Sequence, residues 1–175
     1  MGEDTVWTTL PGPTGPVAIA VSPRGLRRLS LLDRPERAAE HMPDGAVEGE
    51  NERTAAVAAQ LAAYLTGERR EFDLPLDWSD FDGWQRTVLQ TLHETVAYGE
   101  TVSYGELAAR AGRPGAARVV GAIMGSNPIP IVVPCHRVVD SGGGLGGFSG
   151  SRRGPSMETK RRLLTIEGAI APTLF

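Results

Sequence analysis

The fold of the second half of the chain is decided by residues 103–125, which read SYGELAARAGRPGAARVVGAIMG. Ser103 followed by Glu106 is typical of a helix start, because a hydroxyl and a carboxylate at this spacing satisfy free backbone amides. The sequence GRPG at 112–115 then forces a turn. A second helix follows, with apolar residues at positions i, i+3, i+4, i+7 and i+8 counted from Ala116. Two short helices around a glycine-containing turn predict a helix-turn-helix.

One charged residue interrupts the apolar pattern of the second helix. At about 100° per residue, the apolar stripe is centred near Ala116, and Arg118 lies roughly opposite. We therefore expect the Arg118 side chain to face away from the core. An ordinary solvated arginine is the alternative to a functional one, and the spacing alone leaves both open.

The chain's single cysteine lies in residues 127–139, NPIPIVVPCHRVV. Cys135 follows an apolar run, His136 and Arg137 adjoin it, and Glu167 lies downstream. Cationic or proton-accepting neighbours favour the reactive thiolate, whereas a lone intracellular cysteine is often only a small buried hydrophobe. Successive strand residues point to opposite faces, so a bond between Cys135 and His136 needs a turn or a bridging water.

The first part of the chain predicts a smaller mixed domain. Two apolar runs, 17–21 and 26–32, flank a Pro/Gly turn and indicate a β-hairpin. Residues 33–50 are polar and predict a long loop, and residues 51–65 have the apolar spacing of a helix. Residues 72–76 predict an edge strand, because their proline cannot donate to a central ladder.

The regularity of the pattern changes near residue 80. Residues 77–83 are polar, and from Trp84 apolar residues step by four as far as Val96, which predicts a helix. We therefore expect an N-terminal α/β domain at 1–77, a linker at 78–83 and a C-terminal domain at 84–175.

Composition excludes several classes of protein. One cysteine among 175 residues cannot form an internal disulfide, and with three histidines it cannot build a cysteine-rich zinc site. Apolar runs of only a handful of residues exclude a membrane span. The N-terminus lacks the basic region and apolar core of a signal peptide, so we expect a cytoplasmic protein. Residues 1–83 carry a net charge of −7 and residues 84–175 a net charge of +4. Either the second half attracts a phosphate backbone that the first repels, or two solvated surfaces differ by chance, and charge alone leaves both open.

Five ordered motifs resemble those of the O6-alkylguanine-DNA alkyltransferases, also called methylated-DNA–protein-cysteine methyltransferases. They are YGETVSYGELA at 98–108, AARVVG at 116–121, GSNP at 125–128, PCHRVV at 134–139 and LLTIEG at 163–168. The resemblance is close over residues 84–168 and holds only in outline before them. It implies an α/β (α+β) fold, in which a small ribonuclease-H-like α/β domain precedes a mostly helical domain with a helix-turn-helix.

The resemblance also implies a function. The family repairs DNA directly, by an irreversible single-turnover transfer of an alkyl group from O6-alkylguanine to a cysteine, here Cys135. The base is flipped first, because its O6 atom lies inside the stack. The implied partner is double-stranded DNA bound by a monomer, with no cofactor and no metal, and activity on O4-alkylthymine stays open.

Catalytic roles follow from the resemblance, residue by residue. Cys135 is implied as the alkyl acceptor, and His136 takes its proton through a water molecule. Glu167 orients His136, and Asn127 braces the turn behind the site. Tyr104 helps to rotate the target nucleotide and donates a hydrogen bond to the leaving base.

The resemblance assigns further residues to DNA and to the guanine pocket. Arg118 fills the gap left by the flipped base, while the helix-turn-helix lies in the minor groove. The backbone carbonyls of Cys135 and Val138 read the guanine edge, and the Ser149 amide lies near O6. The implied DNA contacts are Ser103, Tyr104, Ala117, Arg118 and Gly121, and the implied pocket is Met124, Cys135, Val138, Phe148 and Ser149.

Two features depart from the family pattern. Phe148 stands where the family commonly has tyrosine, so a hydroxyl is missing although the ring still walls the pocket. Residues 150–157 form a longer link than usual, and their two Gly, one Pro and two Ser predict a mobile loop beside the site. Its two arginines, Arg152 and Arg153, are either phosphate contacts or part of an inert insertion.

Three other function classes compete with alkyl transfer. A binder that only recognises alkylated bases lacks the acceptor cysteine, which this chain has. A transcription regulator that senses alkylation usually adds a second DNA-binding domain, for which 175 residues leave no room. A cysteine hydrolase needs multiple turnover and an oxyanion hole, which nothing in the sequence supports.

Overall fold

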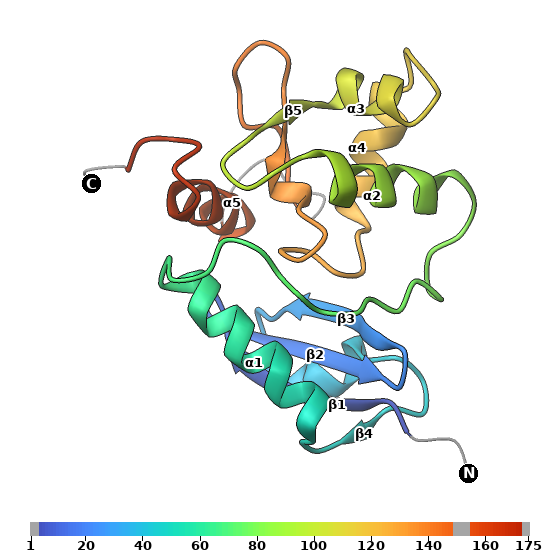
Figure 1. Cartoon of the computed structure of the whole chain (residues 1–175), viewed down its shortest axis with the longest axis vertical. Helices are drawn as coiled ribbons and strands as arrows, with labels where there is room; N and C mark the ends of the chain where they lie inside the picture. The colour runs from blue at the N-terminus through green and yellow to red at the C-terminus, as the bar shows by residue number, and fades with distance from the viewer. Residues whose placement is uncertain (1–3, 149–154, 173–175) are drawn as a thin grey trace. The chain divides into compact units, whose positions relative to one another are not determined.

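The computed structural model describes residues 4–148 and 155–172, and the chain divides into two compact units, residues 1–80 and 81–175 (Figure 1). The first unit combines a sheet with helices and the second is mostly helical, which confirms the α/β (α+β) class. The elements of the first unit are β1 (Val6–Pro11), β2 (Pro16–Ser22), β3 (Gly25–Leu31), the 3₁₀ helix η1 (Pro35–His41), β4 (Val47–Glu48) and α1 (Glu52–Leu65). Those of the second are α2 (Gly83–Thr95), β5 (Val102–Ser103), α3 (Tyr104–Arg110), α4 (Ala117–Gly125), the 3₁₀ helix η2 (Cys135–Arg137), β6 (Val138–Val139) and α5 (Pro155–Ile166).

The sheet of the first unit has the strand order β3-β2-β1-β4. The predicted hairpin is confirmed, because β2 pairs antiparallel with β3, and β2 also pairs antiparallel with β1. β4 joins β1 in parallel. The hairpin turn needs glycine at Gly25, which has a φ of +139° and lies so close to the Pro75 carbonyl that a Cβ atom would collide with it.

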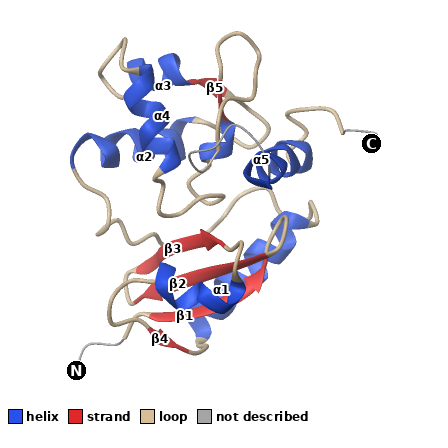
Figure 2. Cartoon of the chain, turned by 180° about the vertical axis from the view of Figure 1, so that it is seen from behind, coloured by secondary structure: helices blue, strands red, loops and turns tan. Residues whose placement is uncertain are grey.

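Both faces of this sheet are covered. Side chains alternate along β2, so Ala18 and Ala20 share one face. On that face they pack in one apolar cluster with Trp7 of β1, Ala38 of η1, and the residues that follow β3 and η1, Leu32 and Met42. Helix α1 crosses the other face in Figure 1 and buries Val57, Leu61 and Tyr64. Figure 2 shows the sheet from behind, with the short helical segment η1 on the near side.

Two predictions for the first unit are wrong in detail. Residues 33–50 are not all loop, because they contain η1 and the two-residue strand β4. Strand β1 lies where no element was predicted. Residues 72–76 do not form an edge strand: Leu76 makes only an isolated bridge to Leu26, whose amide donates to the Pro75 carbonyl at 2.9 Å.

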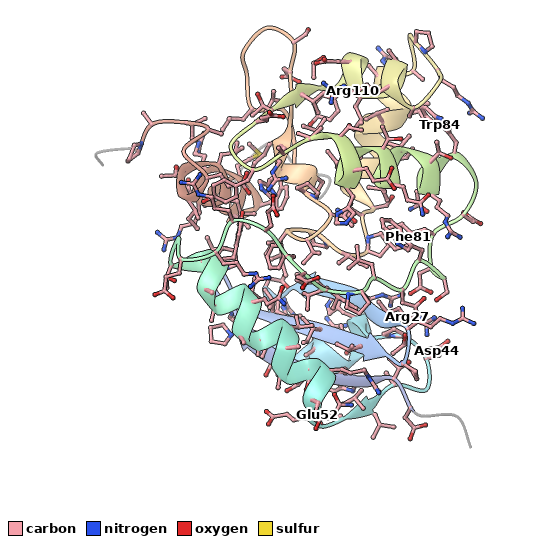
Figure 3. All side chains as sticks on the ribbon, in the orientation of Figure 1. Arg27, Asp44, Glu52, Phe81, Trp84 and Arg110 are labelled. Carbon is pink, nitrogen blue, oxygen red and sulfur yellow. The ribbon has the colours of Figure 1, made fainter. Side chains whose placement is uncertain are left out.

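An ion pair holds the last residues of the first unit against β3. Arg27, labelled in Figure 3, donates from Nε and Nη2 to the two carboxylate oxygens of Asp80 at 2.9 and 2.8 Å. The bidentate geometry fixes the orientation of the guanidinium and carboxylate planes. The hydrogen bond from Arg27 is also the main reason that the pKa of Asp80 is lowered.

The predicted helix-turn-helix is confirmed. Ser103 caps α3, and its Oγ accepts a hydrogen bond from the Glu106 amide at 3.0 Å. The reciprocal half of the expected capping box is absent from this part of the described chain, because the Glu106 carboxylate binds Arg110 one turn later. α3 buries Leu107 and Ala108, and α4 buries Val120, Ile123 and Met124.

Two sequence-based expectations for the second unit need correction. Val119 was placed on the apolar stripe of α4, but it is 51% exposed, because the buried stripe is narrower than the sequence pattern. Residues 155–157 were expected in a loop, but they form the first turn of α5. Residues 150–154, with Arg152 and Arg153, lie outside the described residues. Within the described ranges, no helix is long and apolar enough to cross a membrane.

Helix α1 provides a test of local stability. The Asn51 side chain accepts from the Thr54 amide at 3.0 Å, and Thr54 Oγ1 accepts from the Asn51 amide at 2.9 Å. Replacing Asn51 by alanine removes this capping box and should lower the free energy of unfolding by about 1 kcal/mol, measured by urea denaturation. Asn51→Ser should largely restore stability, and equal loss in both variants would contradict the capping role.

Candidate functional site

The segment that leads to Cys135 is held by its own backbone and by one amide side chain. Asn127 Nδ2 donates to the Val133 carbonyl at 2.8 Å, and Asn127 Oδ1 accepts from the Ile129 amide at 3.0 Å. Within this loop Ile131 has a φ of +74°, a conformation that a β-branched residue rarely adopts. Such strain persists only where the surroundings over-determine the backbone, and here it marks the approach to the cysteine.

Cys135 begins a single 3₁₀ turn that it shares with His136 and Arg137. The turn is deeply buried, and Cys135 is only 3% exposed. Directly after it, β6 pairs in parallel with β5, and Val138 lies opposite Val102. This short ladder connects the cysteine turn to the start of α3, so the two ends of the predicted site are joined by main-chain hydrogen bonds.

A buried carboxylate organises the turn. Glu167, just after α5, has its Oε2 atom 2.7 Å from His136 Nε2. Arg137 donates to the same carboxylate from Nε at 2.8 Å and from Nη2 at 3.1 Å, and its Nη1 donates to the Val96 carbonyl at 2.8 Å. The backbone amide of Gly99 donates to Glu167 Oε1 at 3.3 Å. One carboxylate therefore connects the end of α2, the cysteine turn and the end of α5.

The charges in this network define the protonation state of the histidine. Burial alone would raise the pKa of Glu167, but hydrogen bonds from His136 and Arg137 outweigh it and hold the pKa far below its usual range. Burial lowers the pKa of His136, against the opposing effect of Glu167. A neutral imidazole that donates from Nε2 to an ionised carboxylate leaves Nδ1 as a base. Nδ1 is buried and has no hydrogen-bond partner among the described residues.

The cysteine itself is a protonated thiol at rest. Burial raises the pKa of Cys135, while a hydrogen bond with the Asn127 side chain and the charge of Lys160 act in the opposite direction. Because the thiolate is the nucleophilic form, reaction requires a base that removes the proton.

Lys160 is the residue that the sequence interpretation missed. It lies on α5, is 0% exposed, and its Nζ donates to the Val138 carbonyl at 2.7 Å and to the Gly147 carbonyl at 2.9 Å. Its Nζ also lies 6.0 Å from the centre of the Tyr104 ring. A signal did exist, because Lys160 shares the helical spacing of the buried residues Met157, Leu163 and Leu164.

Tyr104 reaches the same glycine segment from α3. Its hydroxyl accepts a hydrogen bond from the Gly147 amide at 3.2 Å. Gly146 has a φ of +73°, and a Cβ atom there would collide with the Tyr104 hydroxyl. The absence of a side chain at Gly146 therefore lets the phenol lie against the chain that Lys160 holds from the other side.

The structure places the remaining predicted residues in two groups. Val138, Phe148 and Met124 are buried, and the Val138 carbonyl already accepts a bond from Lys160. Arg118 is exposed, as its spacing predicted. Ser103, at the end of β5, is half-buried, as are Ala117 and Gly121 on α4. Ser149 lies outside the described residues. Arg137 was noted in the sequence only as a neighbouring cation, and its ion pair with Glu167 needed the fold to be seen.

Comparison with known proteins agrees with this geometry. Residues 83–169 match the family model for 6-O-methylguanine DNA methyltransferase, DNA binding domain, and residues 5–78 match the model for its ribonuclease-like domain. The chain belongs to the 6-O-methylguanine DNA methyltransferase family. The family resemblance inferred from the five sequence motifs is thereby confirmed.

Individual relatives cover nearly the whole chain. The methylated-DNA–protein-cysteine methyltransferase of Mycobacterium tuberculosis is 41% identical over 175 residues, which span 97% of this chain and 98% of that protein. The human protein of the same name is 38% identical over 169 residues, 92% of this chain and 79% of the relative. A crystal structure of Mycobacterium tuberculosis OGT in complex with DNA has a TM-score of 0.76 and 38% identity, covering 93% of this chain and 92% of that one.

The buried lysine gives a prediction about the reactivity of the thiol. Lys160→Met removes the positive charge that lowers the pKa of Cys135, so the pH profile of Cys135 alkylation should move to higher pH. The alkylation rate at neutral pH should fall severalfold, measured with a small electrophile and intact-protein mass spectrometry. Arg161→Met is the matched control, since Arg161 is the next residue on α5 but is exposed. A profile that does not move would show that Lys160 has no electrostatic effect on the thiol.

Proposed function

We propose that this chain is a methylated-DNA–protein-cysteine methyltransferase, which repairs DNA directly by moving an alkyl group from O6-alkylguanine to Cys135. The observation that carries the proposal is the buried Cys135–His136 turn fixed by Glu167, in a chain whose residues 83–169 match a DNA-binding domain of this family. DNA is the partner, and double-stranded DNA bound by a monomer is the form that we propose. We also propose that residues 84–175 carry the reaction, that 1–77 form a separate domain, and that 78–83 link them in a cytoplasmic protein.

The chemistry is a displacement at carbon. The Cys135 sulfur attacks the alkyl carbon, a carbon–sulfur bond forms, and the bond from that carbon to guanine O6 breaks. The bonding electron pair leaves with guanine, which takes up one proton to become the ordinary base. The resulting thioether has no good leaving group, so each molecule reacts once.

The described residues supply a route for the proton. We propose that His136 Nδ1 receives the thiol proton through a water molecule, because Nε2 is held by Glu167 and Nδ1 is the basic atom. The low pKa of His136 keeps it neutral at physiological pH, which is the form a base requires. Tyr104, held against Gly147, is the proposed donor to the guanine as it leaves.

The DNA-facing part of the proposal rests on α4. Arg118 is exposed, and so is the adjoining Val119. The other exposed positions of the helix are small, namely Ala122 and Gly125, and Gly121 is half-buried. A helix with so few long side chains on its outer side can approach nucleic acid closely. We propose that Arg118 enters the duplex and replaces the flipped base in the stack. The alternatives fit less well: a pure binder has no use for the Cys135–His136–Glu167 arrangement, and a hydrolase would release its product.

Alkyl transfer to Cys135 can be tested by stoichiometry. After incubation with an oligonucleotide that contains O6-methylguanine, the intact protein should gain one methyl group, and peptide mapping should place it on Cys135. Cys135→Ala should lose transfer and keep DNA binding, because the small buried side chain makes no ion pair. Catalytic turnover, or a methyl group on another residue, would refute the mechanism.

The role of Arg118 is tested by comparing two substrates. Arg118→Ala should slow transfer from duplex DNA by about tenfold or more, since about 1.4 kcal/mol of lost stacking support is a factor of ten. Transfer from benzylguanine, a free base that needs no flipping, should keep its rate. Equal slowing on both substrates would mean that Arg118 acts on the site itself and not on the extrusion of the base.

A further inference from the structure

The turn between α3 and α4 carries an arginine that the alkyl-transfer site does not use. The guanidinium of Arg113 lies over the indole of Trp84, with its carbon 4.7 Å from the ring centre. The indole is itself fixed, because Trp84 Nε1 donates to the Ala111 carbonyl at 2.9 Å. Figure 3 labels Trp84 near the start of α2, beside the loop that joins α3 to α4. The side chain of Arg113 therefore stacks on an indole ring that is hydrogen-bonded to the end of α3.

The backbone of Arg113 is equally well held. Its amide donates to the Ala108 carbonyl at 2.9 Å, and its carbonyl accepts from the Ala116 amide at 3.2 Å. One end of the turn is thus closed onto α3 and the other onto the start of α4. Arg113 projects from a fixed point in the helix-turn-helix, although the residue is exposed.

Stacking leaves the hydrogen-bonding capacity of the guanidinium unused. The indole covers one face of the planar group, whereas its five N–H donors lie in the plane and point outward. Within the part of the chain that the structure describes, the Arg113 side chain makes no hydrogen bond and no ion pair. Two acidic residues at the ends of neighbouring helices are otherwise placed: Glu106 binds Arg110, and Asp82 is the residue before α2.

Among the described residues, the arginines that pair with a carboxylate include Arg27, Arg28, Arg37, Arg110, Arg137 and Arg161. Arg113 instead combines an exposed cation, a fixed orientation and free in-plane donors. Those are the properties that recognise a planar or tetrahedral oxyanion such as a phosphate.

We propose that Arg113, oriented by Trp84, binds a backbone phosphate of duplex DNA beside the helix that carries Arg118. The inference rests on the proposed function, since it takes duplex DNA as the partner. A phosphate is favoured over a base because Arg113 lies on the turn that precedes α4 and not on the outer face of the helix. Phosphate contacts fix the register of a protein on DNA without reading sequence, as a repair protein requires.

The salt dependence of binding to an undamaged duplex tests the contact. Arg113→Gln should reduce the slope of log affinity against log salt by about 0.9, the value expected for one phosphate contact. The affinity ratio of parent to variant should consequently shrink about threefold between about 50 and 200 mM salt. Arg113→Lys, which keeps the charge, should keep the slope.

A charge-matched control separates a contact from a general field effect. Arg24→Gln removes the same charge from the exposed hairpin turn of the first unit, outside residues 83–169, and should leave the slope unchanged. If Arg113 only stabilises the packing of the turn against α2, Arg113→Gln should lower the melting temperature. The slope of log affinity against log salt should then equal that of the parent. That outcome overturns the proposal.

A second measurement uses the unaltered protein and so does not depend on the folding of a variant. Phenylglyoxal modifies exposed arginines, and peptide mass spectrometry reports each site. Duplex DNA should protect Arg113 and leave Arg24 reactive, whereas equal reactivity of Arg113 with and without DNA overturns the proposal. Transfer from an oligonucleotide that contains O6-methylguanine is scored in parallel. A parent protein that fails to transfer refutes the proposed function, while protection of Arg113 by DNA is judged independently.

Discussion

The ionised carboxylate of Glu167 is the constraint on which the second unit depends. A charge buried this deeply is costly unless its hydrogen bonds are satisfied, and here two separate segments supply the donors. His136 and Arg137 approach from the cysteine turn, and the Gly99 amide approaches from the chain after α2. Arg137 extends the network to the Val96 carbonyl. Removal of one member would leave an uncompensated charge, so the network fixes the position of the cysteine turn.

A second buried charge acts on the opposite side of the same turn. Lys160 donates to two backbone carbonyls, those of Val138 and Gly147. It therefore holds together the strand after the cysteine turn and the glycine segment on which Tyr104 rests. Lys160 lies near the middle of α5 and Glu167 directly after its end, about two helical turns further on, so this one segment brings an anion to the histidine and a cation to the thiol.

Local patterns in the sequence predict local structure well in this chain. The cap at Ser103, the hairpin between β2 and β3 and the outward direction of Arg118 all follow from spacing and turn chemistry. Strand β4 and the helix η1 do not, because two residues of strand and one buried alanine leave no periodic signal. At the site, the motif identifies Cys135 and His136, but the contact between Glu167 and Arg137 joins residues 30 positions apart and depends on how α5 docks.

The resting site limits the reactivity of the Cys135 thiol as well as supporting its reaction. Burial raises the pKa of the Cys135 thiol and keeps the sulfur protonated, so an electrophile in solution meets neither an exposed nor a charged nucleophile. Burial also lowers the pKa of His136, which keeps the base available at neutral pH. The two shifts are opposite in sign but share one cause, the exclusion of water. The protein is consumed by one reaction. This arrangement ties deprotonation of the thiol to the arrival of a substrate that fills the site, because only then is an alkyl carbon present for the thiolate to attack. The exclusion of water that slows side reactions of the thiol also strengthens the electrostatic interaction of His136, Glu167 and Lys160 with the charges that develop during alkyl transfer.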